Sequence, residues 1–445
     1  MTGEPATTRY LAEAVVVGDR AGTVHRPGAL DVAGSEVAWA GPADAAPPAT
    51  GAVKDVGGVL LPGMVNTHAH TPMTLVRGAG DGLPLARWLA EAIWPLEAVL
   101  CDDDVRWGMR LGAAELLANG VTTTCEQYPR SRPVAEAALE SGIRCVLAPA
   151  VFGDAGPLSG WGHALEEAEA VHADFDGADG RMTVGLGPHS AYALSAEGLV
   201  ATAELAERLD VPITIHVAET TAEEDVVRGA HGCGSVELLE RLGVLERRVV
   251  AAHSVWLSDA DLDRYAAHGV AVAHCPKSNA KLGSGIARLA DMVERGVAVG
   301  LGTDGPASND TLDLWEELRM AALLARARVA DAAAVSTAEA FWLATGAGAA
   351  VLGLAVGILE PGRAADIVRV ETADSRFVPS DTGQQLLSHL VWAAGSRLVT
   401  DVWVAGRAVV ASGRCTTVDV DEARREVEAR SGRLRREAGV RSRGH

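Results

Sequence analysis

The sequence predicts an α/β protein built on a (β/α)8 barrel, and three observations support this fold class. Short β-branched or apolar runs alternate with amphipathic stretches eight times along the chain. Histidines and carboxylates follow most of these runs directly, at the positions where barrel enzymes build their active sites. At 445 residues, the chain is long enough for a large barrel and a second, smaller domain.

The eight runs are the candidate strands of the barrel. They span residues 63–66, 121–125, 144–151, 182–187, 212–217, 249–252, 270–273 and 297–302. Stretches such as LSAEGLVATAELAERLD and GSVELLERLG lie between them, and their apolar residues recur at helical spacing. Further short strands are expected before residue 57, in LAEAVVVGD and GSEVAWAG, and after residue 357, in PGRAADIVRVE and VTDVWVAGRAVVASG.

Charge and cysteine usage restrict the partners and the compartment. The net charge is −20, and the acidic residues are spread along the chain, which argues against a surface for nucleic acid or anionic membrane. The six cysteines are scattered without CxxC pairs, and nothing at the start of the chain resembles a signal peptide. We therefore expect a cytoplasmic protein with reduced thiols.

One segment imitates a membrane span. Residues 340–359, AFWLATGAGAAVLGLAVGIL, carry no charge over a length that could cross a bilayer. The same segment contains four glycines and is followed at once by EPGRAAD, which is typical of a turn. We therefore expect a buried helix that ends at the glycines, followed by a turn into a strand.

The end of the first candidate strand, LPGMVNTHAH, carries two histidines separated by one residue. Because a strand sends alternate side chains to opposite faces, His68 and His70 point the same way. HxH alone is a short pattern, and two unrelated polar residues at a strand exit would also explain it. Five further strand ends also carry such groups. These are His189, His216 with Glu219, His253, His274 and Asp304.

These strand ends resemble those of the amidohydrolase superfamily. The motifs that carry the resemblance are PGMVNTHAHTPMTLVRG, GPHSAYALS, HVAET, AAHSVWL, HCPKSNAKLGSGIA and LGTDGPASNDTLDLWEELR. Within that superfamily, their order and spacing are similar to those of deaminases that act on S-adenosylhomocysteine, methylthioadenosine and related 5′-modified adenosines. The resemblance implies that both flanks form one β-sandwich. We expect its first part in residues 1–57, the barrel in residues 58–356, and its second part with a C-terminal helix in residues 357–445.

The chemistry of such a deamination favours a metal. Free water is a poor nucleophile at neutral pH, and a bound divalent ion lowers its pKa to about 7. His68, His70, His216 and Asp304 form a donor set that suits zinc, or else ferrous iron. Related barrels with two metals bridge them with a carboxylated lysine, and no candidate strand here contains lysine. We therefore expect one divalent metal, with zinc as the first choice.

Three residues are candidates for catalysis. Glu219 follows His216 by three residues and could carry a proton from the attacking water to a ring nitrogen. By the same reasoning, His253 would polarise the water and stabilise charge in the tetrahedral intermediate. Asp304 could accept a water proton while it binds the metal. A solvated loop carboxylate is the plainer alternative for Glu219.

Candidate substrate contacts rest on the resemblance. Trp88 and Glu97 lie in the segment after the first strand that covers the mouth in this family, and Glu97 would hold ribose hydroxyls. His189 matches a residue that contacts the nucleoside, Ser308 is a candidate for the base edge, and Glu219 would also bind the base. A structural histidine and a solvated helix face remain the alternatives for His189 and Glu97.

The loop after the third strand departs from the family pattern. Members that accept an amino-acid tail on the 5′ carbon tend to carry arginines there, and VFGDAGPLSGWGHALEE has none. Arg130 and Arg132 are possible substitutes, although they could be ordinary surface residues. A neutral or differently charged 5′ group, as in 5′-deoxyadenosine, methylthioadenosine or aminodeoxyfutalosine, is therefore as plausible as homocysteine.

Two other functions stay open from the sequence. An aminohydrolase or chlorohydrolase of another heterocycle, such as a triazine or a pterin, would use the same metal site and differ only in its loops. A non-catalytic scaffold barrel is a further alternative, although such proteins usually lose their ligands. The expected partner is a small nucleoside, with no nucleic acid and no membrane, and we expect a homo-oligomer.

Overall fold

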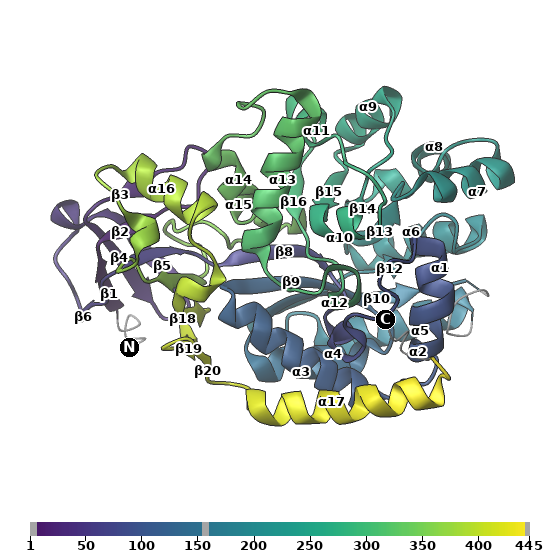
Figure 1. Ribbon diagram of the computed structural model, residues 1–445, viewed down its shortest axis with the longest axis horizontal. Coiled ribbons are helices and arrows are strands. Elements are labelled where there is room, and N and C mark those ends of the chain that lie inside the picture. The colour runs from purple at the N-terminus through teal and green to yellow at the C-terminus, as the bar shows by residue number, and fades with distance from the viewer. Residues whose placement is uncertain (1–6, 154–159, 441–445) are drawn as a thin grey trace.

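The computed structural model describes residues 7–153 and 160–440, and a ring of parallel strands lies at its centre (Figure 1). One sheet has the order β11-β10-β9-β8, and a second has the order β13-β14-β15-β16. Their strands are β8 (Met64–Ala69), β9 (Val121–Tyr128), β10 (Arg144–Val151), β11 (Met182–Val184), β13 (Ile213–Val217), β14 (Val249–His253), β15 (Ala271–His274) and β16 (Val299–Leu301).

Parallel bridges join these two sheets at both edges. Ala69 pairs with Asp304 beside β16, and Leu186 pairs with Ile213 next to β12 (Gly187–Pro188), which continues the line of β11. The eight strand positions therefore close into a ring, and the predicted (β/α)8 barrel is confirmed. Each observed strand overlaps its predicted run. The first strand extends beyond its prediction, so that His68 lies inside β8 and His70 directly follows it.

Helices alternate with the strands around the ring. They are α3 (Asp102–Ala118), α4 (Ser131–Ser141), α5 (Trp161–Phe175), α6 (Ala196–Leu209), α7 (Thr221–His231), α8 (Ser235–Arg241), α9 (Asp259–His268), α10 (Pro276–Lys281), α11 (Leu289–Glu294), α12 (Pro306–Asn309) and α13 (Leu314–Val329). Local sequence sets several of their ends. Ser258 and Asp261 form a capping box at the start of α9, and Gly269 ends that helix in the left-handed region.

The connection from β8 to α3 forms a separate helical segment beside the mouth of the barrel. It consists of η2 (Thr71–Val76), α1 (Leu85–Trp88), the π-helical turn η3 (Leu89–Ile93) and α2 (Trp94–Glu97). Four residues make slightly more than one turn of an α-helix, so side chains four apart rotate gradually around the helix axis. A π-helical turn holds more residues and rotates the next side chain back. Leu85, Leu89, Ile93 and Glu97 accordingly all line one cleft.

The two flanks of the chain form the second domain from two sheets, with orders β5-β4-β1-β6 and β20-β19-β18-β17-β7-β2-β3. The N-terminal strands are β1 (Thr7–Ala12), β2 (Ala14–Val16), β3 (Val24–His25), β4 (Gly28–Ala33), β5 (Glu36–Pro42), β6 (Ala52–Asp55) and β7 (Val59–Pro62). The C-terminal strands are β17 (Ile367–Val370), β18 (Val399–Val404), β19 (Arg407–Ala411) and β20 (Arg414–Cys415). Leu30 and Leu60, one from each sheet, share an apolar core, as in a sandwich.

The boundary between the two domains lies at Gly63. β7 pairs with β2 and β17 of the sandwich, so this sheet includes residues 59–62, which the sequence analysis had placed with the barrel. A Cβ atom on Gly63 would come 2.0 Å from Thr122 Oγ1, so only glycine fits where the chain passes from β7 to β8. The apolar run around Gly63 therefore forms two strands, one in the sandwich sheet and one in the barrel.

The uncharged segment at residues 340–359 belongs to the barrel. It forms α14 (Thr337–Leu343) and α15 (Gly346–Leu352), which pack against β8 and β16. A Cβ on Gly348 would lie 3.0 Å from Val65 O, so the glycine permits this close approach. Among residues 7–153 and 160–440, no helix combines the length and the apolar character needed to span a membrane.

Two more helices complete the described chain. α16 (Gly383–Trp392) packs beside α14, and α17 (Val420–Glu437) lies along α3, at the lower edge of Figure 1. Leu434 of α17 is fully buried in the main core, and Arg430 contacts Asp103 and Asp104 at the start of α3. The predicted C-terminal helix, which follows the last strand of the second domain, therefore packs against the barrel.

Candidate active site

A cleft opens where the barrel strands end, and every predicted metal ligand except His68 lines it. The lining combines site residues with an apolar wall. It includes His70, Met73, Leu85, Trp88, Leu89, Ile93, Trp94, Glu97, Gln127, Tyr128, Phe152, His189, Tyr192, His216, Glu219, His253, Leu282 and Asp304. His68 lies below them, with no exposed surface.

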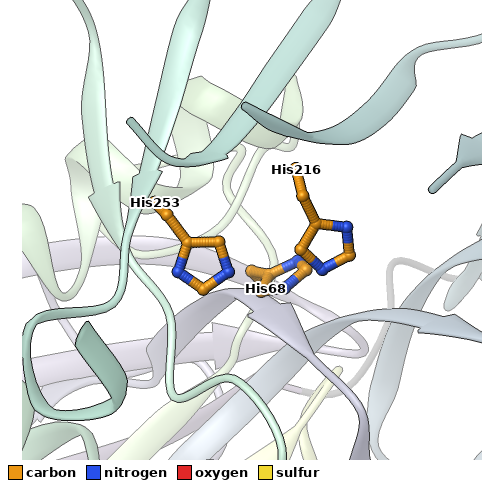
Figure 2. Close-up of side chains that lie close together, drawn as sticks. All are labelled: His68, His216 and His253. Carbon is orange, nitrogen blue, oxygen red and sulfur yellow. The ribbon is translucent and has the colours of Figure 1, made fainter. Parts of the chain in front are cut away.

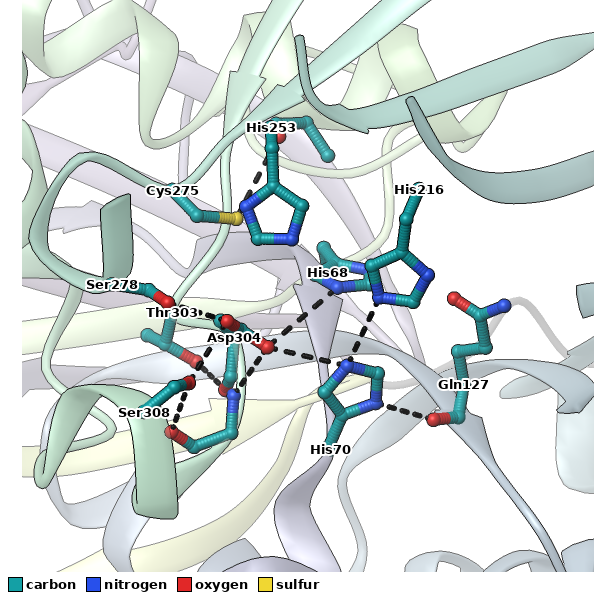
Figure 3. A network of polar contacts seen from close by, with 12 residues as sticks. His68, His70, Gln127, His216, His253, Cys275, Ser278, Thr303, Asp304 and Ser308 are labelled. Carbon is teal, nitrogen blue, oxygen red and sulfur yellow. Dashed lines mark hydrogen bonds and ion pairs between the residues drawn. The ribbon is translucent and has the colours of Figure 1, made fainter. Parts of the chain in front are cut away.

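Two histidines present their Nε2 atoms to each other at the floor of this cleft. His70 Nδ1 lies 2.5 Å from the backbone oxygen of Gln127 (Figure 3). His216 Nδ1 lies 2.7 Å from the backbone oxygen of His189. A carbonyl can only accept a hydrogen bond, so each Nδ1 carries a proton, and a ring in its neutral form then keeps a lone pair on Nε2. These Nε2 atoms lie 3.3 Å apart.

His68 and Asp304 complete the group. Asp304 Oδ1 lies 3.2 Å from His70 Nε2 and 3.8 Å from His68 Nε2. Both ring nitrogens of His68 are buried without a hydrogen-bond partner among the described residues. Burial and the neighbouring imidazoles hold the pKa of His68 and His216 well below the usual value, so both rings are neutral at neutral pH.

This donor set fits a metal ion. Two facing lone pairs repel each other unless a cation lies between them, and two nitrogens bound at 2.0–2.1 Å by a tetrahedral ion are about 3.3 Å apart. A buried imidazole with two orphaned nitrogens and a carboxylate oxygen nearby are the donors that zinc and ferrous iron accept. Of the predicted ligands, His68, His70 and Asp304 form one group that could hold an ion, and His216 Nε2 lies 3.3 Å from His70 Nε2.

His253 lies closer to this group than the sequence analysis anticipated. Its ring nitrogens fall in one cluster with those of His68 and His216, in which the ligand atoms lie within 4.8 Å of one another (Figure 2). His253 Nδ1 lies 2.9 Å from Asn279 Oδ1, and its Nε2 lies 3.7 Å from Glu219 Oε2. Its Nε2 can thus face a water molecule at the ion, or the ion itself.

The backbone is strained where it presents these groups. Asp304, His253 and Ala218 have φ values of 59°, 66° and 50°, which non-glycine residues rarely adopt. Each such residue costs of order 1–3 kcal/mol, and strained residues persist where the surroundings enforce them, often at functional sites. Here they follow three strands whose side chains converge on the cleft.

Glu219 lies beside the donor set, in a nearly dry position. Its side chain is 6% exposed, and Ser284 Oγ donates to its Oε1 at 3.3 Å. Burial raises the pKa of Glu219 above the usual range, which suits a group that must both take up and release a proton near neutral pH. Glu223 accepts the backbone N–H groups of Ala218 and Glu219 at 3.1 and 2.8 Å, and so holds the loop in place.

Ser308 occupies a different place from the one predicted. It is 1% exposed, and its hydroxyl donates to Asp304 Oδ2 at 2.8 Å and lies 3.0 Å from Gly305 O. Ser278 donates to the same Oδ2 at 2.5 Å. Ser308 therefore lies behind Asp304 and supports its carboxylate, because α12 turns this hydroxyl away from the open part of the cleft.

The predicted substrate residues Trp88, Glu97 and His189 all line the cleft. Burial raises the pKa of Glu97 to about 7, although a hydrogen bond from Tyr128 lowers it again in part. Burial lowers the pKa of His189 to about 3, so this ring is neutral, and it stacks on His216 with ring centroids 4.7 Å apart. Trp88 is fixed by a 2.9 Å hydrogen bond from its indole to Ala79 O.

The two candidate arginines point to surface partners. Arg130 pairs with Asp102 at 2.7 Å, and Arg132 pairs with Asp174 at 2.5 Å. No arginine or lysine is among the described residues that line the cleft. Residues 154–159, in the loop after the third strand, lie outside the described part of the chain, and their sequence DAGPLS contains no basic residue.

Sequence reasoning missed several residues that contact the site. Ser278, Asn279 and Ser284 reach the proposed catalytic groups, and Glu126 is a fully buried carboxylate that accepts Thr71 N–H at 2.9 Å, directly after His70. The position of the three polar residues after β15, and of Glu126 near the end of β9, was the available signal. Nothing in the sequence distinguishes such buried polar groups from solvated ones.

Known proteins are similar to this chain in sequence and in structure. The amidohydrolase family pattern matches residues 59–409. The chain is 38% identical to a 5-methylthioadenosine/S-adenosylhomocysteine deaminase of Pelotomaculum thermopropionicum, over 92% of this chain and 95% of that protein. It is 40% identical to a 5′-deoxyadenosine deaminase of Methanothermobacter thermautotrophicus, over 82% and 85% of the two chains. The crystal structure of a zinc-bound adenosine deaminase from Xanthomonas campestris superposes with a TM-score of 0.92 at 32% identity, covering 97% and 99%.

Proposed function

The chain belongs to the amidohydrolase family, and from that premise we propose that it hydrolyses the 6-amino group of 5′-modified adenosines. The products are ammonia and the corresponding inosine analogue. One observation carries the proposal most directly. Imidazole and carboxylate donors that could hold a metal ion, with His68, His70 and Asp304 in one group, lie beside a buried glutamate, in a chain about 40% identical to deaminases of such nucleosides.

His68, His70, His216 and Asp304 are the proposed ligands of one divalent ion. Such an ion makes hydroxide available at neutral pH, because it lowers the pKa of water to about 7. Zinc is the proposed metal, since imidazole and carboxylate donors suit it and the similar structure from Xanthomonas campestris contains it. The hydrogen bonds from His70 and His216 to backbone carbonyls orient both rings toward the ion.

Glu219 is the proposed proton carrier. Its carboxylate takes one proton from the attacking water and delivers it to the ring nitrogen next to the carbon under attack. The carbon can then accept the new C–O bond, because the ring nitrogen takes up the displaced electron pair as an N–H. A second water proton leaves with the amino group as ammonia, and Asp304 is the proposed acceptor that passes it on.

His253 is the proposed stabiliser of the charge that develops on the attacking oxygen. Asn279 Oδ1 accepts the Nδ1 proton of His253, so the Nε2 atom facing Glu219 is free to orient the water. Once protonated, the same nitrogen can donate a hydrogen bond to the oxygen. His253 therefore remains a proposed catalytic residue, even though its ring lies close enough to join the metal ligands.

The cleft favours a neutral, apolar 5′ group. Its wall is lined by side chains such as Met73, Leu89 and Phe152, while Arg130 and Arg132 are paired elsewhere. A carboxylate on the substrate would lose water there without gaining a cationic partner, which is costly. We therefore propose methylthioadenosine or 5′-deoxyadenosine as better substrates than S-adenosylhomocysteine, with Glu97 holding the ribose hydroxyls.

The test is a comparison of specificity constants for the purified, zinc-loaded protein. Ammonia release would be measured with 5′-deoxyadenosine, methylthioadenosine, S-adenosylhomocysteine, adenosine, adenine, a pterin and a triazine. The two apolar nucleosides should react fastest. A triazine or free base that reacts faster would refute the nucleoside assignment, whereas a preference for S-adenosylhomocysteine would refute only the proposed apolar 5′ group.

A further inference from the structure

One short segment after strand β15 contacts the proposed catalytic groups from behind. In residues 276–284, which begin with α10, Ser278 Oγ donates to Asp304 Oδ2 at 2.5 Å. The next residue, Asn279, accepts the Nδ1 proton of His253 at 2.9 Å. Consecutive residues of one helix thus fix the carboxylate and the imidazole that handle protons in the proposed reaction.

The same segment reaches the third proton-handling group. Ser284 Oγ donates to Glu219 Oε1 at 3.3 Å, and Ser284 N–H donates to Asn279 O at 2.8 Å. The contacts to all three groups therefore belong to one connected backbone unit. A small rotation or shift of α10 would change all of them together.

A buried carboxylate on another helix holds the start of α10. Glu317, on α13, has no exposed surface, and its Oε2 accepts the backbone N–H of Lys277 at 3.1 Å. Its Oε1 accepts Asn309 Nδ2–H at 2.6 Å. Asn309 Nδ2 also donates to Thr303 O at 2.6 Å, directly before Asp304. One carboxylate therefore ties together the loops that follow β15 and β16.

We propose that Glu317 is a positioning residue for the deamination, acting through α10 on Asp304, His253 and Glu219. The inference rests on the proposed function of that site. A carboxylate suits this place because both of its neighbours are donors, and a glutamate can accept from each. An amide there would turn one N–H toward another N–H, so one of the two contacts that tie α10 to the loop after β16 would be lost. The nucleoside wall is formed largely by the segment after β8, and only Leu282 of the wall residues named above lies in residues 276–284, so we expect this contact to affect kcat more than KM.

The neighbouring Glu316 supplies a matched control. It bonds the same residue, Lys277, but through the side-chain Nζ, and it also accepts Thr311 Oγ1 at 2.8 Å. Its side chain is 43% exposed, and none of its contacts reaches the α10 backbone. Glu316→Gln therefore removes a charge from the same turn of α13 and leaves the buried clamp intact.

The test compares Glu317→Gln with Glu316→Gln in the zinc-loaded full chain. For Glu317→Gln, we expect kcat to fall tenfold or more while KM for methylthioadenosine changes less than threefold. Zinc affinity, measured on the apo chain by competition with a chelator, should weaken by about tenfold, the usual scale for a residue that orients a ligand. Glu316→Gln should match the unaltered protein in all three quantities. A kcat for Glu317→Gln within twofold of the control would overturn the proposal.

A double-mutant cycle with Asn279→Ala separates positioning from general destabilisation. If Glu317 acts through α10, the part of its effect on kcat that passes through His253 should disappear once Asn279 no longer holds that ring, so the two losses should multiply only in part. Losses that multiply fully would overturn the proposed route. Should Glu317→Gln fail to fold, Asn309→Ala cuts the other arm of the clamp, and an unchanged kcat in that variant would overturn the proposal. The zinc measurement involves no substrate, so it gives a result even if the proposed substrate is wrong.

Discussion

The Nε2 atoms of His70 and His216 lie 3.3 Å apart, and each ring gives its Nδ1 proton to a backbone carbonyl. When both rings are neutral, the two Nε2 lone pairs face each other, and a cation between them would be held by both. The fold supplies this arrangement because β8 and β13 present the two histidines, and neighbouring segments of the barrel present the two carbonyls. This geometry leads directly to the first prediction.

The chain should bind one equivalent of a divalent metal, and His216→Ala should lose metal and activity together. The alanine removes one of the facing donors from the proposed set of four and leaves the remaining three without the geometry in which they hold the ion. Elemental analysis of the purified chain gives the stoichiometry. His231→Ala, at the exposed end of α7, is the control and should keep its metal. Two equivalents per active chain, or a metal-loaded His216→Ala variant, would contradict the ligand assignment.

Glu219→Gln should keep the metal and the fold but lose turnover by roughly a hundredfold or more, the usual scale for a general acid and base. Glutamine has nearly the same shape as glutamate but cannot carry a proton. Steady-state kinetics on metal-replete protein provide the measurement, with Asp225→Asn, an exposed carboxylate of α7, as the control. Near-normal deamination by Glu219→Gln would mean that another group moves the proton.

The sequence supports much of this fold because the barrel repeats one simple pattern. Each β-branched run became a parallel strand, and His70, His189, His216 and His253 line one cleft, since parallel strands end on the same side. The run before His68 was ambiguous, because an apolar stretch does not show where one sheet stops and another begins. Gly63 marks that point only when Thr122 is seen beside it.

The supporting residues of the site could not be predicted in this way. Glu316 and Glu317 are adjacent acids on one amphipathic helix, and only the packing of α13 on α10 makes the second one buried. Ser308 follows Asp304 closely in sequence, but its direction depends on the turn into α12. The direction of a side chain after a strand depends on the conformation of the loop, and the spacing of apolar residues in the sequence does not specify that conformation.

The buried ion pair between the two domains should matter more for stability than for catalysis. Arg144 on β10 contacts Asp366, at the start of the sheet strand β17, at 3.0 Å, and both are nearly inaccessible to solvent. Asp366→Ala leaves a buried charge without its partner, which typically costs about 3–5 kcal/mol of stability. We expect a clear fall in Tm with kcat little changed. Asp174→Ala, which breaks the exposed pair with Arg132, should change Tm very little. Equal shifts in the two variants would contradict the buried role.

Glu97 should make nucleoside selectivity depend on pH. Burial raises its pKa to about 7, so the group is an ionised acceptor above that pH and a neutral carboxyl below it. Hydrogen bonds to a charged acceptor contribute about 1.5–3 kcal/mol, against about 0.5–1.5 kcal/mol for neutral ones. Recognition of the ribose should therefore weaken as the pH falls from 8 to 6, while recognition of the base should not.

The ratio of kcat/KM for 5′-deoxyadenosine to kcat/KM for adenine isolates this effect. Both substrates need the same metal, Glu219 and His253, so titration of those groups cancels in the ratio. A difference of about 1 kcal/mol between charged and neutral acceptors corresponds to a fall of roughly fivefold in the ratio on acidification. Glu97→Gln keeps a neutral acceptor at every pH, so its ratio should be low and independent of pH. Glu97→Ala removes the acceptor and should lower the ratio of the nucleoside to the free base further. A ratio that is independent of pH in the unaltered protein, or one that Glu97→Ala leaves unchanged, would show that another group holds the ribose.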